Sequence, residues 1–168
     1  SYRTTREALK IAHRFLRTDR RARRRTHFSA IPACEFDEEF LGMQRRLDDA
    51  TVVNLWALFE RSLIEHVTAS WPDGIDRPET FVVRLQEKAA REIERWRVEE
   101  LLDLYKGWVG SETLGAVKQV KSYRDWVAHR NPRKVPSAVI RPEPAFGAVV
   151  AMMQTVVGDE PGGSQPAS

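Results

Sequence analysis

The chain has 168 residues, 42% of them hydrophobic and 30% charged, with a formal net charge of +3. This length suits one domain with a substantial core, and no apolar run is long enough to cross a bilayer. The Arg-rich first residues lack the hydrophobic region of a secretory signal, and the single cysteine, Cys34, excludes an internal disulfide. These features predict a cytoplasmic protein with no membrane partner.

Charge is distributed unevenly along the chain. Residues 1–35 carry ten Lys or Arg against three Asp or Glu, a net +7, and residues 36–110 carry ten against sixteen, a net −6. Residues 111–141 carry seven against two, a net +5, and the remainder carries −3. The two basic segments could attract a polyanion, or they could neutralise the acidic segment within the fold. Charge alone leaves both interpretations open.

Residues 4–25 are predicted to form one helix, because Leu9, Ala12 and Leu16 recur at helical spacing. The run Arg20–Arg25 contains one alanine and no apolar stripe. We interpret it as a solvated or frayed helix end, with contact to nucleic acid as the alternative.

A second helix is predicted to begin at Asp37, after a loop over residues 28–36, and to run to about Ser70. Its second half carries the strongest core pattern in the chain, an apolar stripe with spacings of three and four. Glu60 lies on the shoulder of that stripe, where a carboxylate needs a partner or access to water. The stripe consists of Val52, Trp56, Phe59, Leu63 and Val67.

Four further helices are predicted after a turn at residues 71–74. The first of them has an apolar stripe that ends at Trp96. Residues 132–144 contain four prolines and are expected to be irregular. The predicted helices span residues 78–96, 98–106, 111–129 and 145–157.

These elements define the predicted architecture. Helical patterns dominate and the alternating pattern of a β-strand is absent from the sequence, which predicts an all-α fold, a bundle of five or six helices. Residues 1–157 are expected to form a single domain with a basic N-terminal helix. Residues 158–168 are rich in Gly, Pro and Ser and are expected to be a disordered tail.

Arg124 has the most informative position on the helix predicted for residues 111–129. At about 100° per residue it lies near the middle of an apolar side, between Val117 and Val120. A guanidinium stays charged and is costly to bury without an anion. That anion could be Glu60, in an internal salt bridge, or a substrate phosphate. The apolar side comprises Leu114, Val117, Val120, Val127 and Ala128.

His129 follows Arg124 by five residues, about 140° further around the helix. The two side chains therefore converge only if the helix unwinds near His129 or if a second copy of the segment faces the first. A histidine at this end of a helix favours the helix dipole, and it can also transfer protons. Arg61 and His66 have the same spacing, so spacing alone is not specific.

The segment Tyr123-Arg124-Asp125-Trp126-Val127-Ala128-His129-Arg130-Asn131-Pro132 resembles the signature of HEPN domains, in particular the bacterial RiboL-PSP-type branch. That signature is an Arg, a polar residue, three more residues and a His, late in an all-α domain. The segment Leu55–Glu60 is similar to the family's long core helix, which often carries an aromatic residue followed by an acid. The resemblance covers about residues 45–131 in organisation, and the ten-residue motif is its specific part.

The resemblance implies a metal-independent endoribonuclease that cleaves RNA as a homodimer, with two motifs in one basic cleft. In this interpretation His129 transfers protons, and Arg124 holds the scissile phosphate and stabilises the charge of the transition state. The expected substrate-binding residues are Asp125, Asn131, Lys121 and Arg130, of which Asp125 and Asn131 also orient the catalytic pair.

The resemblance also implies a cellular role, as a toxin or a phage-defence effector. Some members carry a Tyr shortly after the His, which a cognate antitoxin protein modifies. Here Arg130-Asn131-Pro132 follow His129, so the resemblance allows an antitoxin partner without implying this mode of regulation.

No metal or cofactor is expected, because one cysteine and four scattered histidines lack the spacing of a zinc site. The alternative function is a non-catalytic helical module that binds a protein partner or a nucleotide. An internal pair between Arg124 and Glu60 within one subunit would favour this alternative. The nuclease instead requires Arg124 and His129 at a shared two-fold cleft.

Overall fold

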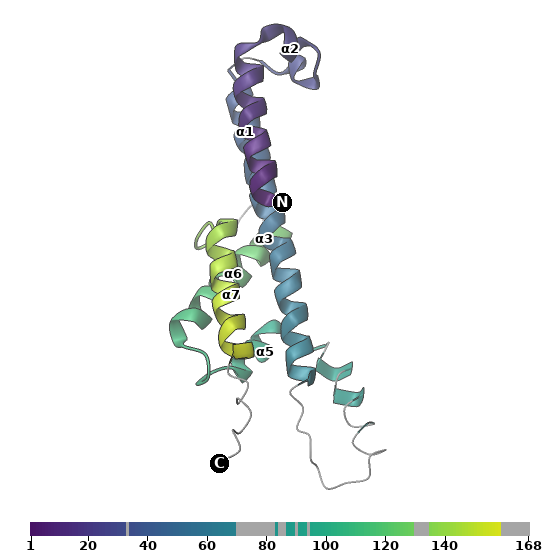
Figure 1. The fold of residues 1–168 in the computed structure, drawn as a ribbon, viewed down its shortest axis with the longest axis vertical. Helices are drawn as coiled ribbons and strands as arrows, with labels where there is room; N and C mark the ends of the chain where they lie inside the picture. Colours follow the sequence, from purple (N-terminus) through teal and green to yellow (C-terminus); the bar gives the residue numbers. More distant parts are fainter. Residues whose placement is uncertain are drawn as a thin grey trace, which may run out of the picture. The chain divides into compact units, whose positions relative to one another are not determined.

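The computed structural model describes residues 1–32, 34–69, 83, 87–89, 91–93, 95–129 and 135–158. Within these ranges the regular structure is helical, apart from an isolated bridge between Lys106 and Val109 (Figure 1). The prediction of an all-α fold is therefore confirmed. In the same ranges, no helix combines the length and the apolar character needed to span a membrane.

The chain divides into two compact units, Ser1–Val52 and Val53–Ser168. The long helix α3 (Phe36–Ala69) contributes residues to both units. It begins one residue before the predicted start, and its described part ends one residue before the predicted end. That residues 1–157 behave as a single domain stays a prediction.

In the first unit, α1 (Tyr2–Thr18) lies alongside the first half of α3 (Figure 1). The Tyr2 hydroxyl donates to Asp48 Oδ1 at 2.8 Å, and His13 Nε2 lies 2.8 Å from Asp37 Oδ1. Because the start of α1 pairs with the later residue of α3, the two helices are antiparallel. An apolar cluster closes this hairpin, formed by Leu16, Phe28 of the 3-10 helix η1 (His27–Ala30), Phe36 and Phe40.

The prediction of one helix over residues 4–25 is wrong. A separate helix, α2 (Arg20–Arg24), follows α1 after a break at Asp19. The Asp19 carboxylate accepts hydrogen bonds from the backbone N–H groups of Arg21 and Ala22, at 2.8 and 3.0 Å. This capping arrangement satisfies the free donors at the start of a new helix, which is why the chain breaks there.

The second unit has its core around the second half of α3. Trp56, Phe59 and Leu63 are buried as predicted, and Val67 is half-buried. Helix α6 (Ser111–His129) packs against α7 (Pro142–Gly158), as Figure 1 shows. Further buried residues of this unit are Leu101 and Leu102 of α5 (Val98–Leu104), Val117 and Val120 of α6, and Val149 and Met152 of α7.

Helix α6 has the predicted boundaries, Ser111 and His129. Three residues of its predicted apolar side, Leu114, Val117 and Val120, are buried, whereas Ala128 is exposed. Tyr123 is buried as well, although the predicted apolar side omitted it. The buried face of α6 therefore follows the predicted stripe for its first three turns and moves away from it near the end of the helix.

Helix α7 begins at Pro142, three residues before the predicted start. The prediction of irregular structure up to residue 144 is therefore wrong for its last three residues. Pro142 and Pro144 both lie in the first turn of α7, where the missing N–H group of proline costs no hydrogen bond. Residues 135–141 are not helical, as expected.

Several predicted features fall outside the described residues, namely the turn at 71–74, most of the helix at 78–96 and the tail after Gly158. Within 78–96, residues 83, 87–89 and 91–93 are helical. Trp96 lies in a bend and is 41% exposed, so its inclusion in the apolar stripe was wrong.

Leu63 and Leu58 test the packing of the second unit, because they lie on the same helix with opposite exposure. Leu63 is fully buried and Leu58 is 70% exposed. We expect Leu63→Ala to lower the free energy of unfolding by about 2–5 kcal/mol, since it removes buried apolar surface and leaves a cavity. Leu58→Ala should change it by less than about 0.5 kcal/mol. Urea denaturation followed by circular dichroism measures both, and equal losses would contradict this placement of the core.

Candidate functional site

Arg124 of α6 forms an ion pair with Glu60 of α3. Its Nη2 donates to Glu60 Oε2 at 3.0 Å, and its Nη1 donates to Asp125 Oδ1 at 2.9 Å. The guanidinium carbon also lies 5.7 Å from the centre of the Trp56 ring, within the range of a cation–π contact. Arg124 therefore has anionic partners within its own chain, as the interpretation of an internal salt bridge predicts.

These contacts do not enclose the Arg124 side chain, which is 27% exposed. A guanidinium has five N–H donors, and the two hydrogen bonds to Glu60 and Asp125 use two of them. The other three donors have no hydrogen-bond partner among the described residues.

Asp125 links Arg124 to Lys121. Lys121 Nζ lies 2.8 Å from Asp125 Oδ2 and also forms an ion pair with Glu99 of α5. Burial lowers the pKa of Lys121, but its hydrogen bonds to Asp125 and Glu99 outweigh that effect and the pKa is raised. The hydrogen bond from Lys121 in turn lowers the pKa of Glu99. Lys121, a predicted substrate-binding residue, is thus held by two carboxylates.

The ion-pair cluster around Arg124 is not basic. It combines two cations, Arg124 and Lys121, with three carboxylates, Glu60, Asp125 and Glu99, which gives a net charge of −1 when all are ionised. The basic cleft that the family resemblance implies is therefore not formed by these five side chains alone. Additional positive charge would have to come from elsewhere in the chain or from a second copy.

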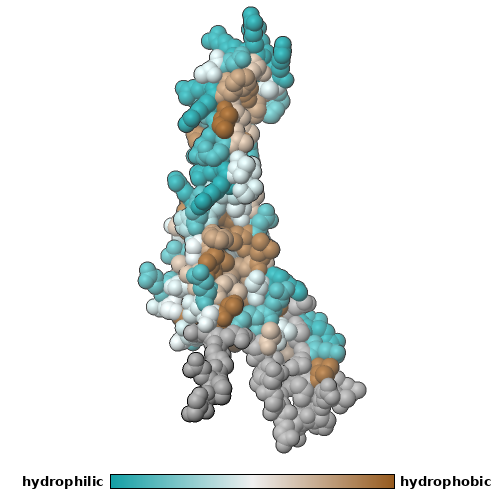
Figure 2. Space-filling model, viewed as in Figure 1, coloured by the Kyte–Doolittle hydropathy of each residue, from teal (hydrophilic) through white to brown (hydrophobic). Residues whose placement is uncertain are grey.

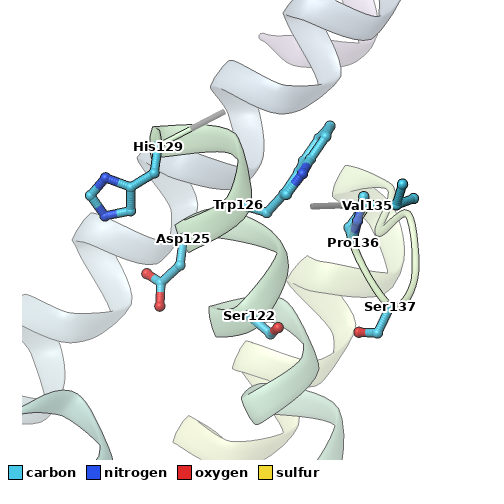
Figure 3. Close-up of a pocket in the computed structure, with 7 residues that line it drawn as sticks. All are labelled: Ser122, Asp125, Trp126, His129, Val135, Pro136 and Ser137. Atoms are coloured by element: carbon cyan, nitrogen blue, oxygen red, sulfur yellow. The ribbon is translucent and has the colours of Figure 1, made fainter. Parts of the chain in front are cut away.

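His129, at the end of α6, borders a surface cavity of about 460 Å³. The His129 side chain is exposed and makes no hydrogen bond or ion pair with another residue of the described ranges. Figure 3 shows Asp125 and His129 pointing to the same side of α6, one turn apart. A cavity of this size is large enough for a small ligand. It is lined by Ser122, Asp125, Trp126, His129, Val135, Pro136 and Ser137.

Arg124 and His129 do not meet within one chain. Helix α6 stays helical to His129, so unwinding of its end does not bring the two side chains together. Arg124 is directed to Glu60, whereas His129 lines the cavity. Asp125 takes part in both surroundings, because it accepts a hydrogen bond from Arg124 and also lines the cavity. Two arrangements could bring Arg124 and His129 together, unwinding of the helix end or pairing of two copies of the chain, and only the second remains.

Two of the predicted site residues, Arg130 and Asn131, lie outside the described residues. The prediction missed Glu99 and most of the cavity lining. Ser122, Asp125, Trp126 and His129 have spacings of three and four on one helix, so a helical projection could have grouped them. Nothing in the sequence pointed to Glu99.

The second Arg-x4-His pair, Arg61 and His66, has ordinary structural contacts. Arg61 Nε donates to Glu65 Oε1 at 2.7 Å, and His66 Nδ1 lies 3.0 Å from the hydroxyl of Tyr105. Where the structure describes the chain, no group of three or more His, Cys, Asp or Glu side chains could hold a metal ion.

Comparison with known proteins gave no match for this chain among family models, curated proteins or solved structures.

Proposed function

We propose that the chain is a metal-independent endoribonuclease of the HEPN kind that cleaves RNA as a homodimer. The observation that carries the proposal is the placement of His129, which is exposed at the end of α6 beside the cavity that Asp125 also lines. The side chain of Arg124 in the same motif is 27% exposed. Its hydrogen bond to Glu60 joins the two segments that resemble the family, 55–60 and 123–132, but a pair within one subunit does not by itself support the nuclease.

The proposed reaction is a transesterification of the RNA backbone. The ribose 2′-oxygen forms a bond to the adjacent phosphorus, and the bond from phosphorus to the 5′-oxygen of the next nucleotide breaks. His129 of one copy takes the proton of the 2′-hydroxyl, and His129 of the other copy donates a proton to the leaving 5′-oxygen. The products are a 2′,3′-cyclic phosphate and a 5′-hydroxyl, with no net gain or loss of protons.

Arg124 has the second role in this reaction. Its N–H donors that are not bonded to Glu60 or Asp125 bind the oxygens of the scissile phosphate. Charge builds on these oxygens in the transition state, so donors that are already in place stabilise it without reorganising. Glu60 and Asp125 hold the guanidinium plane in a fixed orientation. In this way the cluster, although its net charge is negative, presents N–H donors to an anion.

A second copy supplies what one chain lacks. Within one chain, Arg124 and His129 point about 140° apart around α6. Two-fold pairing of the ends of α6 brings His129 of one copy toward Arg124 of the other and provides two proton-transfer groups. The sequence adds positive charge directly after His129, at Arg130, Arg133 and Lys134. In this assembly Arg130 and Asn131 join Lys121 and Asp125 as the proposed substrate-binding residues.

The proposed cellular role is that of a toxin or defence effector that cuts cellular RNA, with a cognate antitoxin as a partner. It rests on the family resemblance alone. The reaction can be tested without knowing the cellular target, because transesterification needs only a ribose 2′-hydroxyl and a phosphate.

A second candidate function is a non-catalytic helical module that binds a protein partner or a nucleotide. The pair between Arg124 and Glu60 favours this second function, because the guanidinium has an anion within its own subunit. In that case the cavity beside His129 is a binding site and His129 transfers no proton. The two candidates therefore differ in what His129 does.

The test is incubation of the full chain with an oligoribonucleotide in EDTA, beside a matched oligonucleotide with 2′-deoxy sugars. The nuclease proposal predicts cleavage of the ribose substrate and an intact deoxy substrate, since the deoxy sugar has no nucleophile. An intact ribose substrate with folded, dimeric protein would favour the non-catalytic module.

A further inference from the structure

The run Arg20–Arg25 contains one arginine that turns inward. Arg23 Nε donates to the carbonyl oxygen of Phe28 at 3.2 Å, and its Nη2 donates to the carbonyl oxygen of Ile31. The guanidinium carbon lies 4.3 Å from the centre of the Phe36 ring, a close cation–π contact. Arg23 thereby fixes α2 to the aromatic cluster of the first unit, so the position of the run is set by packing.

The other four arginines of the run point outward. Arg20, Arg21, Arg24 and Arg25 are exposed, and their side chains make no hydrogen bond or ion pair with a described residue. The neighbouring carboxylate, Asp19, is occupied by the backbone N–H groups that start α2. Figure 2 shows hydrophilic side chains projecting at the end of the first unit where Figure 1 places α2. We name these four residues the arginine cap.

Several other exposed cations of the chain have carboxylate partners, unlike the four residues of the arginine cap. Arg46 pairs with Glu39 at 2.8 Å, Arg61 with Glu65 at 2.7 Å and Lys106 with Asp103 at 2.8 Å. Four unpaired guanidinium groups within six residues repel one another, and an anion with several charges relieves that repulsion. A guanidinium group also binds phosphate with two parallel hydrogen bonds. Four such groups can bind several phosphates of one chain, which suits a polyphosphate better than a single ion.

We propose that the arginine cap binds the phosphate backbone of single-stranded RNA. The choice of RNA among polyphosphates rests on the proposed nuclease function, and the binding itself rests on the geometry of α2. The cap and the pair Arg124 and His129 lie in different units of the chain, so binding and cleavage can be separated by mutation.

The experiment measures binding of a fluorescent oligoribonucleotide of about 20 nucleotides, long enough to contact the whole cap. The protein is the full chain carrying His129→Ala, so that cleavage does not interfere. The cap variant adds Arg20→Gln, Arg21→Gln, Arg24→Gln and Arg25→Gln. The control variant adds Arg46→Gln, Arg61→Gln, Arg95→Gln and Lys106→Gln, which remove the same charge from cations that have carboxylate partners.

We expect the cap variant to bind the oligoribonucleotide more weakly, and its affinity to depend less on salt concentration. The control variant should keep both the affinity and its salt dependence. Each phosphate contact to a single strand contributes about 0.7 to the slope of log affinity against log salt, so four contacts contribute about 3. Over a fourfold rise in salt, a slope of that size corresponds to about a fiftyfold change in affinity. Circular dichroism checks that both variants are folded.

Equal binding by the cap and control variants would overturn the inference, whatever the outcome for cleavage. Binding of polyglutamate as tight as that of RNA would overturn the choice of a phosphate backbone, and tighter binding of single-stranded DNA would overturn the choice of RNA. If RNA binds through the cap but the wild-type chain never cleaves it, the nuclease proposal fails and the inference stands.

Discussion

His129→Ala is expected to lower the rate of RNA cleavage in EDTA by about 10²–10⁴-fold while the helical fold survives, because a proton-transfer group typically contributes that factor. The fold should survive because His129 is exposed at the end of α6 and makes no hydrogen bond or ion pair with a described residue. Rates of oligoribonucleotide cleavage and circular dichroism give the two readouts. Induction of the wild-type chain in a bacterial host should also stop growth, whereas induction of His129→Ala should not.

His66→Ala is the matched control for this variant. His66 has the same spacing from Arg61 as His129 has from Arg124, but His66 is hydrogen-bonded to the hydroxyl of Tyr105. We expect His66→Ala to lower the melting temperature, since it leaves the hydroxyl of the buried Tyr105 without this partner, and to keep the wild-type cleavage rate. Loss of cleavage in both variants, or in neither, would contradict the assignment of His129.

Arg124→Ala is expected to have two separate effects. Cleavage should fall by about 10²–10³-fold, because donors aimed at the scissile phosphate are lost. The free energy of unfolding should also fall by about 1–3 kcal/mol, because Glu60 loses its ion pair while less than a third exposed and Asp125 keeps only Lys121. Arg124→Lys should not restore cleavage fully, since an ammonium lacks the planar set of donors.

The double variant Arg124→Ala with Glu60→Gln separates these two effects. Removing the charge of Glu60 relieves the unpaired carboxylate, so stability should recover in part. Cleavage should not recover, because the phosphate ligand is still missing. A different outcome is that Arg124→Ala lowers only the free energy of unfolding and that the wild-type chain does not cleave RNA. In that case Arg124 is a structural residue, and the non-catalytic module is the better account.

Much of the fold could be predicted because the relevant signals are local. Asn131-Pro132 predicted the end of α6 near His129, and the spacing of apolar residues located the core face of α3. The errors also have local causes. Asp19 caps a new helix with its side chain and divides the predicted helix 4–25, and Pro142 starts α7 where a proline is tolerated.

The candidate site could be predicted from the sequence only where it depends on the position of a residue on its own helix. The angle of Arg124 on α6 showed that it needs an anion, and the shoulder position of Glu60 on α3 made it the best candidate. The link from Lys121 to Glu99 could not be predicted, because α5 has no motif that fixes its angle against α6. The cavity wall at Val135–Ser137 depends on how the chain returns after α6, which proline content alone does not determine.

The most direct test of the account is the mass of the products from an oligoribonucleotide cleaved by the wild-type chain in EDTA. The account predicts a 2′,3′-cyclic phosphate on one fragment and a 5′-hydroxyl on the other. These ends form because the ribose 2′-oxygen attacks the adjacent phosphorus, while His129 transfers protons and Arg124 binds the phosphate. Fragments that end in a 3′-hydroxyl and a 5′-phosphate, or a substrate of unchanged mass beside folded protein, would contradict it.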